Sequence, residues 1–269
     1  MKIFYNKKNL LKFINNEKNL GFVPTMGGIH KGHISLVKNS IKKCNKTIVS
    51  IFVNKAQFNS RSDFKKYPRN IIKDISILKK AKVDYLYIPS TREIYPKGTN
   101  SKILISKFST KLCGRFRPGH FKAVADVINS FLKIIKPKKI FFGKKDMQQL
   151  LIVKHFLKKN YPNIKVIGCD TIRQKNGVAL SSRNFLLTNE EDQIASKVYH
   201  LLVKVKKNII KSEIKKKVII KQIINLGIDK LDYLELIDIN KLSMPFVKKN
   251  KYKIFIAYYL GSTRLIDNI

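Results

Sequence analysis

Apolar and polar positions along the first two thirds of the chain follow the pattern of short strands separated by helices. Apolar runs rich in Val, Ile and aromatic residues recur at residues 21–23, 47–53, 83–88, 140–142 and 164–169. Between these runs, apolar residues recur at the spacing of three and four that is typical of helices. Strands that alternate with helices predict an α/β fold, built on a doubly wound parallel sheet with right-handed crossovers.

The same pattern predicts the order of the elements around those strands. Residues 1–19 are expected to form an opening strand and a short helix, and residues 102–105 an additional strand. Helices are expected from the turn at residues 27–28 to about residue 44, at residues 71–78, from residue 119 to Pro137, and at residues 147–159. Proline ends the third of these helices because it lacks a backbone donor and its ring clashes with the preceding turn.

Beyond residue 171 the pattern changes to one lysine-rich helical region followed by two strands. Thr188 and Glu191 have the spacing of a capping box, which predicts a helix start, and the helical region runs to about residue 226. Residues 231–237 and 253–260 alternate in a way that suits an antiparallel pair. We therefore expect two domains, a larger one at residues 1–171 and a smaller α+β domain at residues 172–269.

The charge balance is strongly basic, with a formal net charge of +39 over 269 residues. Only eight of the 56 basic residues are arginine, and the lysines are spread along the chain. A dedicated nucleic-acid-binding protein more often uses clustered arginine with interleaved aromatic residues. We therefore expect a solvated lysine surface without specific nucleic-acid binding, and we retain a basic nucleic-acid-binding protein as the alternative from another class.

Other features of the composition bear on location. No apolar run approaches the ~18 residues of a membrane helix, and the first 20 residues lack the apolar core of a secretory signal. Cys44, Cys113 and Cys169 are widely spaced, odd in number and outside any Cys-x-x-Cys pattern. This spacing argues for reduced thiols and against a structural metal. We therefore expect a cytoplasmic protein that does not bind a membrane.

One stretch, residues 24–33, carries the most specific chemical signal. It follows the apolar run at 21–23 and precedes a helical pattern, so it reads as a strand, a tight turn and a helix start. Gly27 and Gly28 allow a ligand to approach the backbone, and a helix N-terminus presents N–H groups to an anion. His30 and His33 are three residues apart, so their rings share a face of the first turn. The spacing matches the His-x-Gly-His signature of nucleotidyl transferases and predicts binding of ATP.

Further polar residues follow other predicted strands. Asn54 and Gln57 follow the strand at 47–53, and Lys145 and Asp146 follow the strand at 140–142. Because ligands bind at the carboxyl ends of the strands in such sheets, these side chains are expected to gather with the histidines on one edge. Taken singly, each also has an interpretation without a chemical role, as a surface lysine, an ordinary helix residue or a capping side chain.

Taken together, the motifs make the whole chain resemble the pantothenate synthetase family, AMP-forming ligases of pantoate and β-alanine within the His-x-Gly-His superfamily. The resemblance rests on residues 23–27 with His30 and His33, residues 49–54 with Gln57 and Phe58, residues 67–69, 93–96 and 117–121, Phe142 and Gly143 with Lys145, Asp146, Gln148 and Gln149, residues 180–184, and residues 264–268. It implies a Rossmann-like larger domain that binds nucleotide and pantoate, and a smaller domain that covers the active site.

The resemblance implies a reaction and a set of residues for it. ATP adenylates the pantoate carboxylate with release of pyrophosphate, and the amine of β-alanine then expels AMP to give pantothenate. The implied catalytic residues are His33, the residue usually assigned as proton donor, with His30 and Lys145. The implied ATP contacts are Met26, Gly27, Gly28, Ile29, His30, Lys31, Gly32, His33, Gly143, Lys144, Lys145, Asp146, Ile172, Leu180, Ser181, Ser182 and Arg183. Gln57 and Gln149 would hold pantoate, and Gln57 would also border β-alanine.

The resemblance also implies Mg²⁺ carried by ATP, no metal held by the protein itself, and a homodimer. Four positions depart from the family pattern, namely Lys55, Ala123, Asp126 and Lys144, while every residue with an implied chemical role is present. The nearest alternative is another adenylate-forming enzyme of the same superfamily with a different small substrate, against which Gln57 and Gln149 argue.

Overall fold

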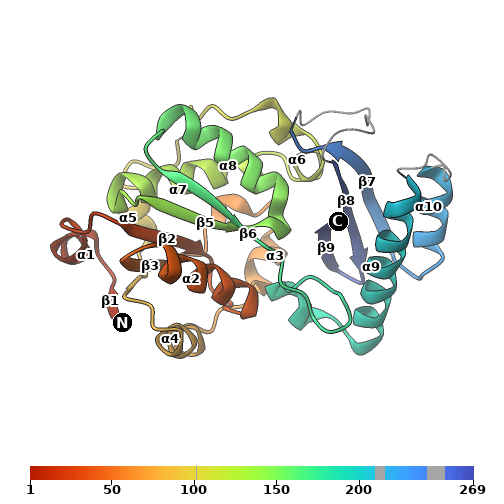
Figure 1. Ribbon diagram of the computed structural model, residues 1–269, viewed down its shortest axis with the longest axis horizontal. Helices are drawn as coiled ribbons and strands as arrows, with labels where there is room; N and C mark the ends of the chain where they lie inside the picture. The colour runs from red at the N-terminus through yellow and green to blue at the C-terminus, as the bar shows by residue number, and fades with distance from the viewer. Residues whose placement is uncertain (101, 210–215, 241–251) are drawn as a thin grey trace. The chain divides into compact units, whose positions relative to one another are not determined.

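The computed structural model describes residues 1–100, 102–209, 216–240 and 252–269. Internal contacts divide the chain into two compact units, Met1–Thr171 and Ile172–Ile269. Figure 1 colours the first unit from red to green and the second in blue-green and blue. None of the helices within the described residues has the length and apolar character that a membrane span requires.

The first unit is built on a six-stranded parallel sheet in the order β1-β4-β3-β2-β5-β6. The strands are β1 (Lys2–Phe4), β2 (Leu20–Thr25), β3 (Lys46–Ile51), β4 (Tyr85–Tyr87), β5 (Lys139–Gly143) and β6 (Lys165–Cys169). Every strand lies within or overlaps a run that the apolar pattern predicted, so the doubly wound α/β prediction is confirmed.

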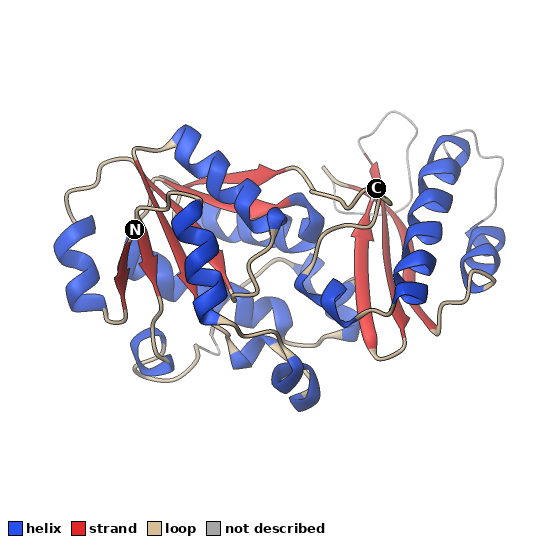
Figure 2. Cartoon of the chain, turned by 90° about the horizontal axis from the view of Figure 1, so that it is seen from below, coloured by secondary structure: helices blue, strands red, loops and turns tan. Residues whose placement is uncertain are grey.

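Helices cover both faces of this sheet, as Figures 1 and 2 show. The α-helices described in this unit are α1 (Lys7–Ile14), α2 (Lys31–Lys43), α3 (Arg61–Lys66), α4 (Ile71–Lys80), α5 (Thr91–Ile94), α6 (Cys113–Phe116), α7 (His120–Ile135) and α8 (Met147–Asn160). On one face, Val37 of α2 and Leu78 of α4 are fully buried against Val23, Val49 and Phe141 of the strands. Burial of these side chains is the main free-energy gain that fixes the two helices on the sheet.

The other face is filled by aromatic side chains around α7. The ring of Phe131 lies 5.4 Å from the ring of Phe22 in β2 and 6.2 Å from the ring of Tyr87 in β4. Strands with both faces buried in this way tend to be rich in apolar residues, which fits the apolar centres of β2 (Phe22 and Val23) and β3 (Ile48 and Val49). The sequence pattern and the packing therefore have the same cause.

The strand order reverses direction between β2 and β5. From β2 the chain moves outward through β3 and β4, and it then returns to place β5 on the other side of β2. In open α/β sheets, ligands bind at such a switch point, outside the carboxyl ends of the strands. The turn at residues 26–30 follows β2 and the loop at residues 144–146 follows β5, so both predicted chemical stretches lie at this point.

The expected strand at residues 102–105 is wrong. Residues 103–105 have no regular structure, and they pair with no strand among the described residues. Ile103 is buried whereas Leu104 is 77% exposed, so this short apolar run anchors a surface loop through one side chain. An apolar run of three residues is too short to distinguish such a loop from a strand.

The second unit contains a three-stranded antiparallel sheet in the order β7-β8-β9. Its strands are β7 (Lys230–Asp238), β8 (Tyr252–Leu260) and β9 (Thr263–Asn268), and its helices are α9 (Asn189–Ile209) and α10 (Lys216–Ile224). Leu202 of α9 and Ile223 of α10 pack against Ile256 of β8 in a shared apolar core. The expected antiparallel pair is confirmed, while part of the lysine-rich helical region, residues 210–215, lies outside the described residues.

Two local features of this unit are the start of α9 and the third strand of the sheet. The predicted capping box is present, because the amide of Thr188 donates to Glu191 Oε2 at 2.8 Å and the amide of Glu191 donates to Thr188 Oγ1 at 3.2 Å. The third strand, β9, was not predicted, since residues 264–268 were noted only as a family motif. A tight turn at Gly261, with φ of +52°, joins it to β8.

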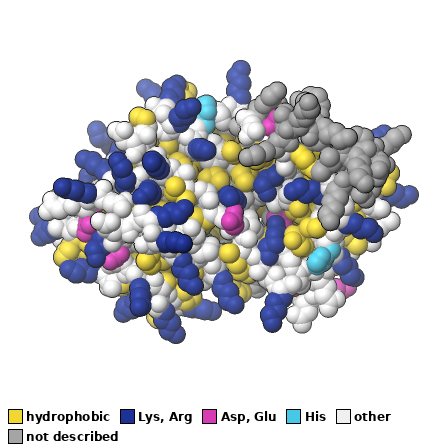
Figure 3. Space-filling model, viewed as in Figure 1, with side chains coloured by type: hydrophobic (Ala, Val, Ile, Leu, Met, Phe, Trp, Pro, Cys, Tyr) yellow, Lys and Arg dark blue, Asp and Glu magenta, His cyan; other side chains and the backbone are white. Residues whose placement is uncertain are grey.

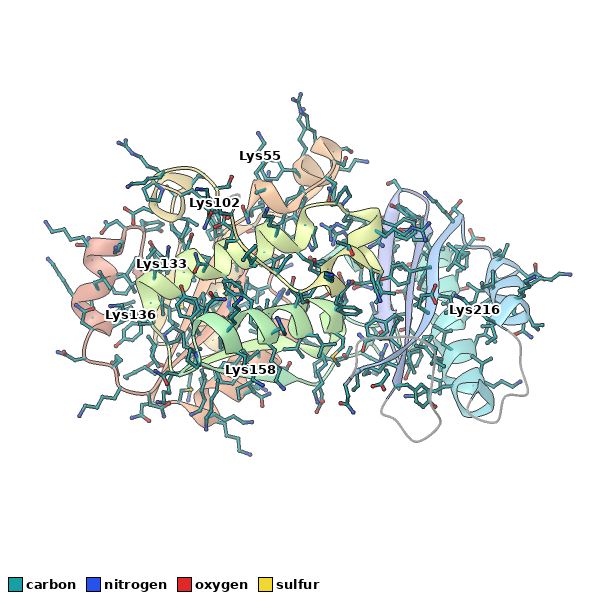
Figure 4. All side chains as sticks on the ribbon, turned by 90° about the horizontal axis from the view of Figure 1, so that it is seen from above. Lys55, Lys102, Lys133, Lys136, Lys158 and Lys216 are labelled. Carbon is teal, nitrogen blue, oxygen red and sulfur yellow. The ribbon has the colours of Figure 1, made fainter. Side chains whose placement is uncertain are left out.

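Lysine side chains are spread over the surface. Figure 3 shows them across one face without a single dense patch. The lysines labelled in Figure 4 are all exposed; they are Lys55, Lys102, Lys133, Lys136, Lys158 and Lys216. Lys216 forms an ion pair with Glu235 at 2.8 Å.

Candidate active site

The turn between β2 and α2 has the predicted strand, turn and helix geometry. Gly27 and Gly28 have φ angles of +83° and +63°, a region that side chains other than glycine rarely adopt. His30 is the N-cap residue of α2 in an extended conformation, and His33 stands in its first turn. The two glycines therefore allow the chain to reverse sharply enough to deliver both histidines to the switch point.

The two imidazoles form a reciprocal cap on the helix. His30 Nδ1 accepts a hydrogen bond from the amide of Gly32 at 3.0 Å, and His33 Nδ1 accepts one from the amide of His30 at 3.4 Å. The ring centroids are 4.1 Å apart, with the planes tilted by 37°. Because a backbone amide always donates, neither Nδ1 carries a proton, and each neutral ring carries its proton on Nε2.

The surroundings keep both rings neutral. Burial lowers the pKa of His30 to about 4, and the positive charge of Lys145 adds to the shift. Burial, followed by the proximity of His30, lowers the pKa of His33 to about 3. The Asp146 carboxylate opposes both shifts without reversing them. At neutral pH the pair therefore offers two Nε2–H donors without a positive charge.

The backbone amides of the turn are not directed to an external anion, contrary to the sequence-based expectation. Asp74, a buried residue of α4, accepts hydrogen bonds from the amides of Gly28 at 2.9 Å and Ile29 at 2.8 Å. The amide of Gly27 donates to Thr25 Oγ1 at 3.2 Å. These three amides bind internal oxygen atoms because leaving buried donors unpaired would cost about 1–3 kcal/mol each.

Two adjacent lysines in the loop after β5 have different partners and different exposure. Lys144 forms an ion pair with Asp170 at 2.6 Å, and 42% of its side chain is exposed. The ammonium of Lys145 lies 3.3 Å from Asp146, and only 18% of its side chain is exposed. Lys145 also acts electrostatically on both His30 and His33. The structure thus confirms that the polar residues after β2 and β5 meet at one edge of the sheet.

Two adjacent glutamines in the first turn of α8, Gln148 and Gln149, also differ in burial. Gln148 is buried, and its amide group donates to the carbonyls of Phe108 at 3.0 Å and Lys111 at 2.7 Å. Its Oε1 accepts from the amide of Cys113 at 3.1 Å. Gln148 therefore forms hydrogen bonds with the backbone on both sides of Leu112. The φ of Leu112 is +49°, which is strained for a residue with a side chain. Gln149 is only partly buried.

The loop after β3 brings Gln57 to the same edge of the sheet. Gln57 is 8% exposed and ends the short 3₁₀ helix Lys55–Gln57, which Asn54 caps through its side chain. Two side chains bind the Gln57 carbonyl oxygen: Arg117 Nη2 at 3.0 Å and His120 Nδ1 at 2.8 Å. His120 Nδ1 donates to this carbonyl, so its Nε2 accepts from Arg117 Nη1 at 3.3 Å. The Arg-Pro-Gly-His motif therefore fixes the backbone of Gln57.

The remaining predicted ATP contacts belong to the second unit. The amide of Leu180 donates to the carbonyl of Ile172 at 2.9 Å, so these two positions are neighbours. Ser181 Oγ accepts from the amide of Arg183 at 3.2 Å, and Asn184 Oδ1 accepts from the amide of Ser181. Ser182 is buried. The hydroxyl of Ser181 thus caps the 3₁₀ helix Ser182–Leu186 and orders the segment that carries Arg183.

An ion pair that no sequence motif predicted joins Arg173, at the start of the second unit, to β9. Arg173 binds Asp267 of β9 through two bonds of 2.6 and 2.9 Å, and it also donates to the Gly177 carbonyl at 3.0 Å. Its guanidinium lies 4.4 Å from the centre of the Tyr199 ring. A bidentate arginine–carboxylate pair gives a defined geometry, which explains the aspartate within the motif at residues 264–268.

All four positions that depart from the family pattern have hydrogen-bond or ion-pair partners, including the Lys55 carbonyl, which accepts from the amide of Phe58 at 3.1 Å. Lys144 binds Asp170, the Ala123 carbonyl accepts from Asn54 Nδ2 at 3.3 Å, and Asp126 accepts from the amide of Asn100 at 2.8 Å. Burial raises the pKa of the Asp126 carboxyl. Lys55 is an exposed residue of the 3₁₀ helix that ends at Gln57.

The neutral histidine pair leads to a measurable titration. In the ligand-free protein, ¹⁵N NMR should show the Nε2–H tautomer for His30 and His33 from pH 8 down to about pH 5, with signals assigned by single His→Ala variants. Both pKa values lie below the ordinary 6.5, so the unfolded chain takes up more protons below about pH 6.5. Their contribution to stability is therefore complete above that pH and falls as the pH drops toward 4 and 3. Titration of either ring near pH 6.5 would contradict the geometry.

Comparison with known sequences agrees with this arrangement. The family model described as pantoate-beta-alanine ligase matches residues 2–269. The pantothenate synthetase of Sulfurihydrogenibium sp. (strain YO3AOP1) is 41% identical over 262 residues, covering 94% of this chain and 92% of that protein. The pantothenate synthetase of Buchnera aphidicola subsp. Acyrthosiphon pisum (strain APS) is 42% identical over 275 residues, covering 100% of this chain and 95% of that protein.

Solved structures give the same result. The crystal structure of pantothenate synthetase from Thermus thermophilus matches with a TM-score of 0.91 at 29% identity, covering 100% of this chain and 99% of that one. Pantoate-beta-alanine ligase from Francisella tularensis, complexed with beta-gamma ATP and β-alanine, matches with a TM-score of 0.83 at 36% identity, covering 100% and 97%. With the histidine pair at the switch point and a full-length match, this chain belongs to the pantoate–β-alanine ligase family.

Proposed function

We propose that this chain catalyses the ATP-dependent condensation of pantoate with β-alanine, giving pantothenate, AMP and pyrophosphate through a pantoyl adenylate. The observation that carries the proposal is the full-length family match of a chain whose two neutral imidazoles and Lys145 meet at the switch point of the sheet. The ATP and β-alanine of the Francisella tularensis complex support the same pair of substrates for this chain.

In the first step, a pantoate carboxylate oxygen attacks the α-phosphorus of ATP. The new bond is O–P, the bond that breaks joins the α-phosphorus to the bridging oxygen, and pyrophosphate leaves with the electron pair. We assign the ATP contacts to the residues that the family resemblance implies, including His30, His33, Lys145 and Arg183. ATP enters as its Mg²⁺ complex, so this Mg²⁺ arrives as part of the substrate and shields charge on the triphosphate.

The geometry suits this step in two ways. Lys145 supplies a fixed positive charge where the carboxylate and the phosphate would otherwise repel each other. The Nε2–H groups of His30 and His33 donate hydrogen bonds that strengthen as negative charge builds on the leaving pyrophosphate. Because the rings are neutral before ATP binds, they do not add repulsion between cations to a site that already holds Lys145.

In the second step, the β-alanine amine attacks the acyl carbon of the adenylate. A C–N bond forms, the bond between that carbon and the AMP oxygen breaks, and the amine loses a proton. We assign pantoate binding to Gln57 and Gln149, whose amide groups both donate and accept, and we place Gln57 at the border of the β-alanine site. Arg117 and His120 support this role because they hold the Gln57 backbone in place.

Several broader properties belong to the same proposal. We assign nucleotide and pantoate binding to the first unit and the contacts from Ile172 and residues 180–183 to the second. We infer a homodimer from the family resemblance. A cytoplasmic location is supported by Cys44, Cys113 and Cys169, which are all buried free thiols. The scattered lysines support the prediction that the chain binds no specific nucleic acid.

The adenylation step can be tested without the second substrate. Given Mg²⁺–ATP and pantoate alone, the protein should exchange labelled pyrophosphate into ATP, because the residues assigned to adenylation do not include the amine. His33→Ala should lower this exchange by about 10²-fold or more, as for loss of a preorganised donor. Exchange that strictly requires β-alanine, or formation of ADP and phosphate, would contradict the proposal.

The two adjacent lysines provide a matched comparison. Lys145→Ala should slow pyrophosphate exchange by about 10²-fold or more, because it removes a preorganised charge beside the histidines. Lys144→Ala should change the rate by less than about threefold, since it removes a half-exposed ion pair with Asp170, and such pairs contribute little. Both variants lose one charge from the same loop, so equal losses of activity would show that the assignment of Lys145 is wrong.

A further inference from the structure

The strongest unexplained feature near the site is a buried carboxylate with no apparent catalytic use. Asp74 lies in the first half of α4, more than 40 residues along the chain from the turn it binds. It is 3% exposed, and its two oxygens accept from successive amides, Oδ2 from Gly28 and Oδ1 from Ile29. A buried carboxylate needs strong compensation, because removing its charge from water costs several kcal/mol.

The compensation comes from the glycine turn. Among the residues that the structure describes, no ion pair joins Asp74 to a lysine, arginine or histidine. Successive amides from a turn with positive φ at Gly27 and Gly28 form a concave donor set of the kind that binds anions. The anion that this turn binds is therefore the protein's own carboxylate.

We propose that Asp74 is a positioning residue for adenylation, which fixes the glycine turn so that His30 and His33 face the triphosphate. This inference rests on the proposed function, because it assigns the two imidazoles to the phosphates. The turn amides then bind Asp74 throughout the reaction, and the side chains of His30, His33 and Lys145 bind the phosphates.

A continuous series of hydrogen bonds connects Asp74 to both rings. Asp74 holds the amides of Gly28 and Ile29, and the next residue is His30. The amide of His30 donates to the ring of His33, and the ring of His30 accepts from the amide of Gly32. A shift of the backbone at residues 28–29 would therefore move the amide of His30, which orients the His33 ring. It would also move the His30 ring itself.

Packing around the carboxylate makes its length and charge specific. A Cβ added at Gly27 would lie 2.9 Å from Asp74 Oδ2, so there is little space above the turn. Leu78, one helical turn after Asp74, packs in the same apolar core as Ile29. Asparagine at this position would turn an NH₂ group toward one amide donor, and glutamate would add a methylene group where there is little room.

Asp84 provides a matched control at the opposite end of the same sheet. Its Oδ2 accepts from the amide of Thr47 at 2.9 Å, and its Oδ1 binds Lys46 Nζ at 3.0 Å. Thr47 is the second residue of β3, whereas the candidate site follows the carboxyl ends of the strands. Asp84→Asn therefore also weakens a bond between a carboxylate and a backbone amide, but far along the strands from the chemistry.

The experiment compares Asp74→Asn with Asp84→Asn in pyrophosphate exchange, at a temperature at which both proteins are folded. Asp74→Asn should lower kcat by about 10- to 100-fold, because a misplacement of about 1 Å can cost 10²-fold. The KM for ATP should stay the same or rise. Asp84→Asn should keep kcat within about twofold of the wild-type value. If Asp74→Asn does not fold, Asp74→Glu replaces it with the same expectation.

Two further readouts separate positioning from a general loss of structure. The ring ¹⁵N signals of His30 and His33 should shift in Asp74→Asn and not in Asp84→Asn. In a His33→Ala background, Asp74→Asn should cost much less than in the wild type, because residues that act as a unit are not additive. Equal kcat values for the two aspartate variants would overturn the inference. A lower KM for ATP in Asp74→Asn would also overturn it, since Asp74 would then compete with phosphate for the turn.

If the wild-type protein itself shows no exchange, the proposed function fails. An active wild-type protein whose Asp74→Asn variant behaves like Asp84→Asn leaves the proposed function intact and removes only the positioning role of Asp74. The two failures are therefore distinguishable in the same set of measurements.

Discussion

The geometry of the candidate site depends on one constraint, the pair of hydrogen bonds by which the Asp74 carboxylate holds the turn between β2 and α2. A turn with two positive φ angles presents its amides in one direction, and such a concentration of donors requires an anion. Here the anion comes from the neighbouring helix α4. The turn is consequently rigid before any substrate arrives, which reduces the ordering cost of binding a flexible triphosphate.

The same constraint determines the charge of the site. With the amides of Gly28 and Ile29 bound to Asp74, the phosphate contacts that we propose are side chains, and their charges differ. Burial keeps His30 and His33 neutral, while Lys145 keeps a positive charge beside them. In the step that we propose, two neutral donors beside Lys145 avoid the repulsion that three adjacent cations would create, and they direct hydrogen bonds to oxygens that gain charge during reaction.

The sequence predicted most of the fold because its signals are local. The buried strands have short apolar centres that stand out in the sequence, and the bonds between Thr188 and Glu191 follow from a spacing of three residues. The contribution of Asp74 was hidden, because an aspartate within a helical pattern looks like a solvated residue until tertiary packing places it under a turn from a distant segment. Strand β9 was missed for a similar reason, since its pairing with β8 depends on the turn at Gly261 rather than on a strong apolar run.

An isotope-transfer experiment tests the adenylate intermediate most directly. The protein is incubated with Mg²⁺–ATP, β-alanine and pantoate labelled with ¹⁸O in its carboxylate, and AMP, pyrophosphate and any phosphate are analysed by mass spectrometry. Attack of the carboxylate on the α-phosphorus predicts one ¹⁸O atom in each AMP formed, together with unlabelled pyrophosphate. Label in inorganic phosphate together with ADP, or unlabelled AMP, would contradict the account.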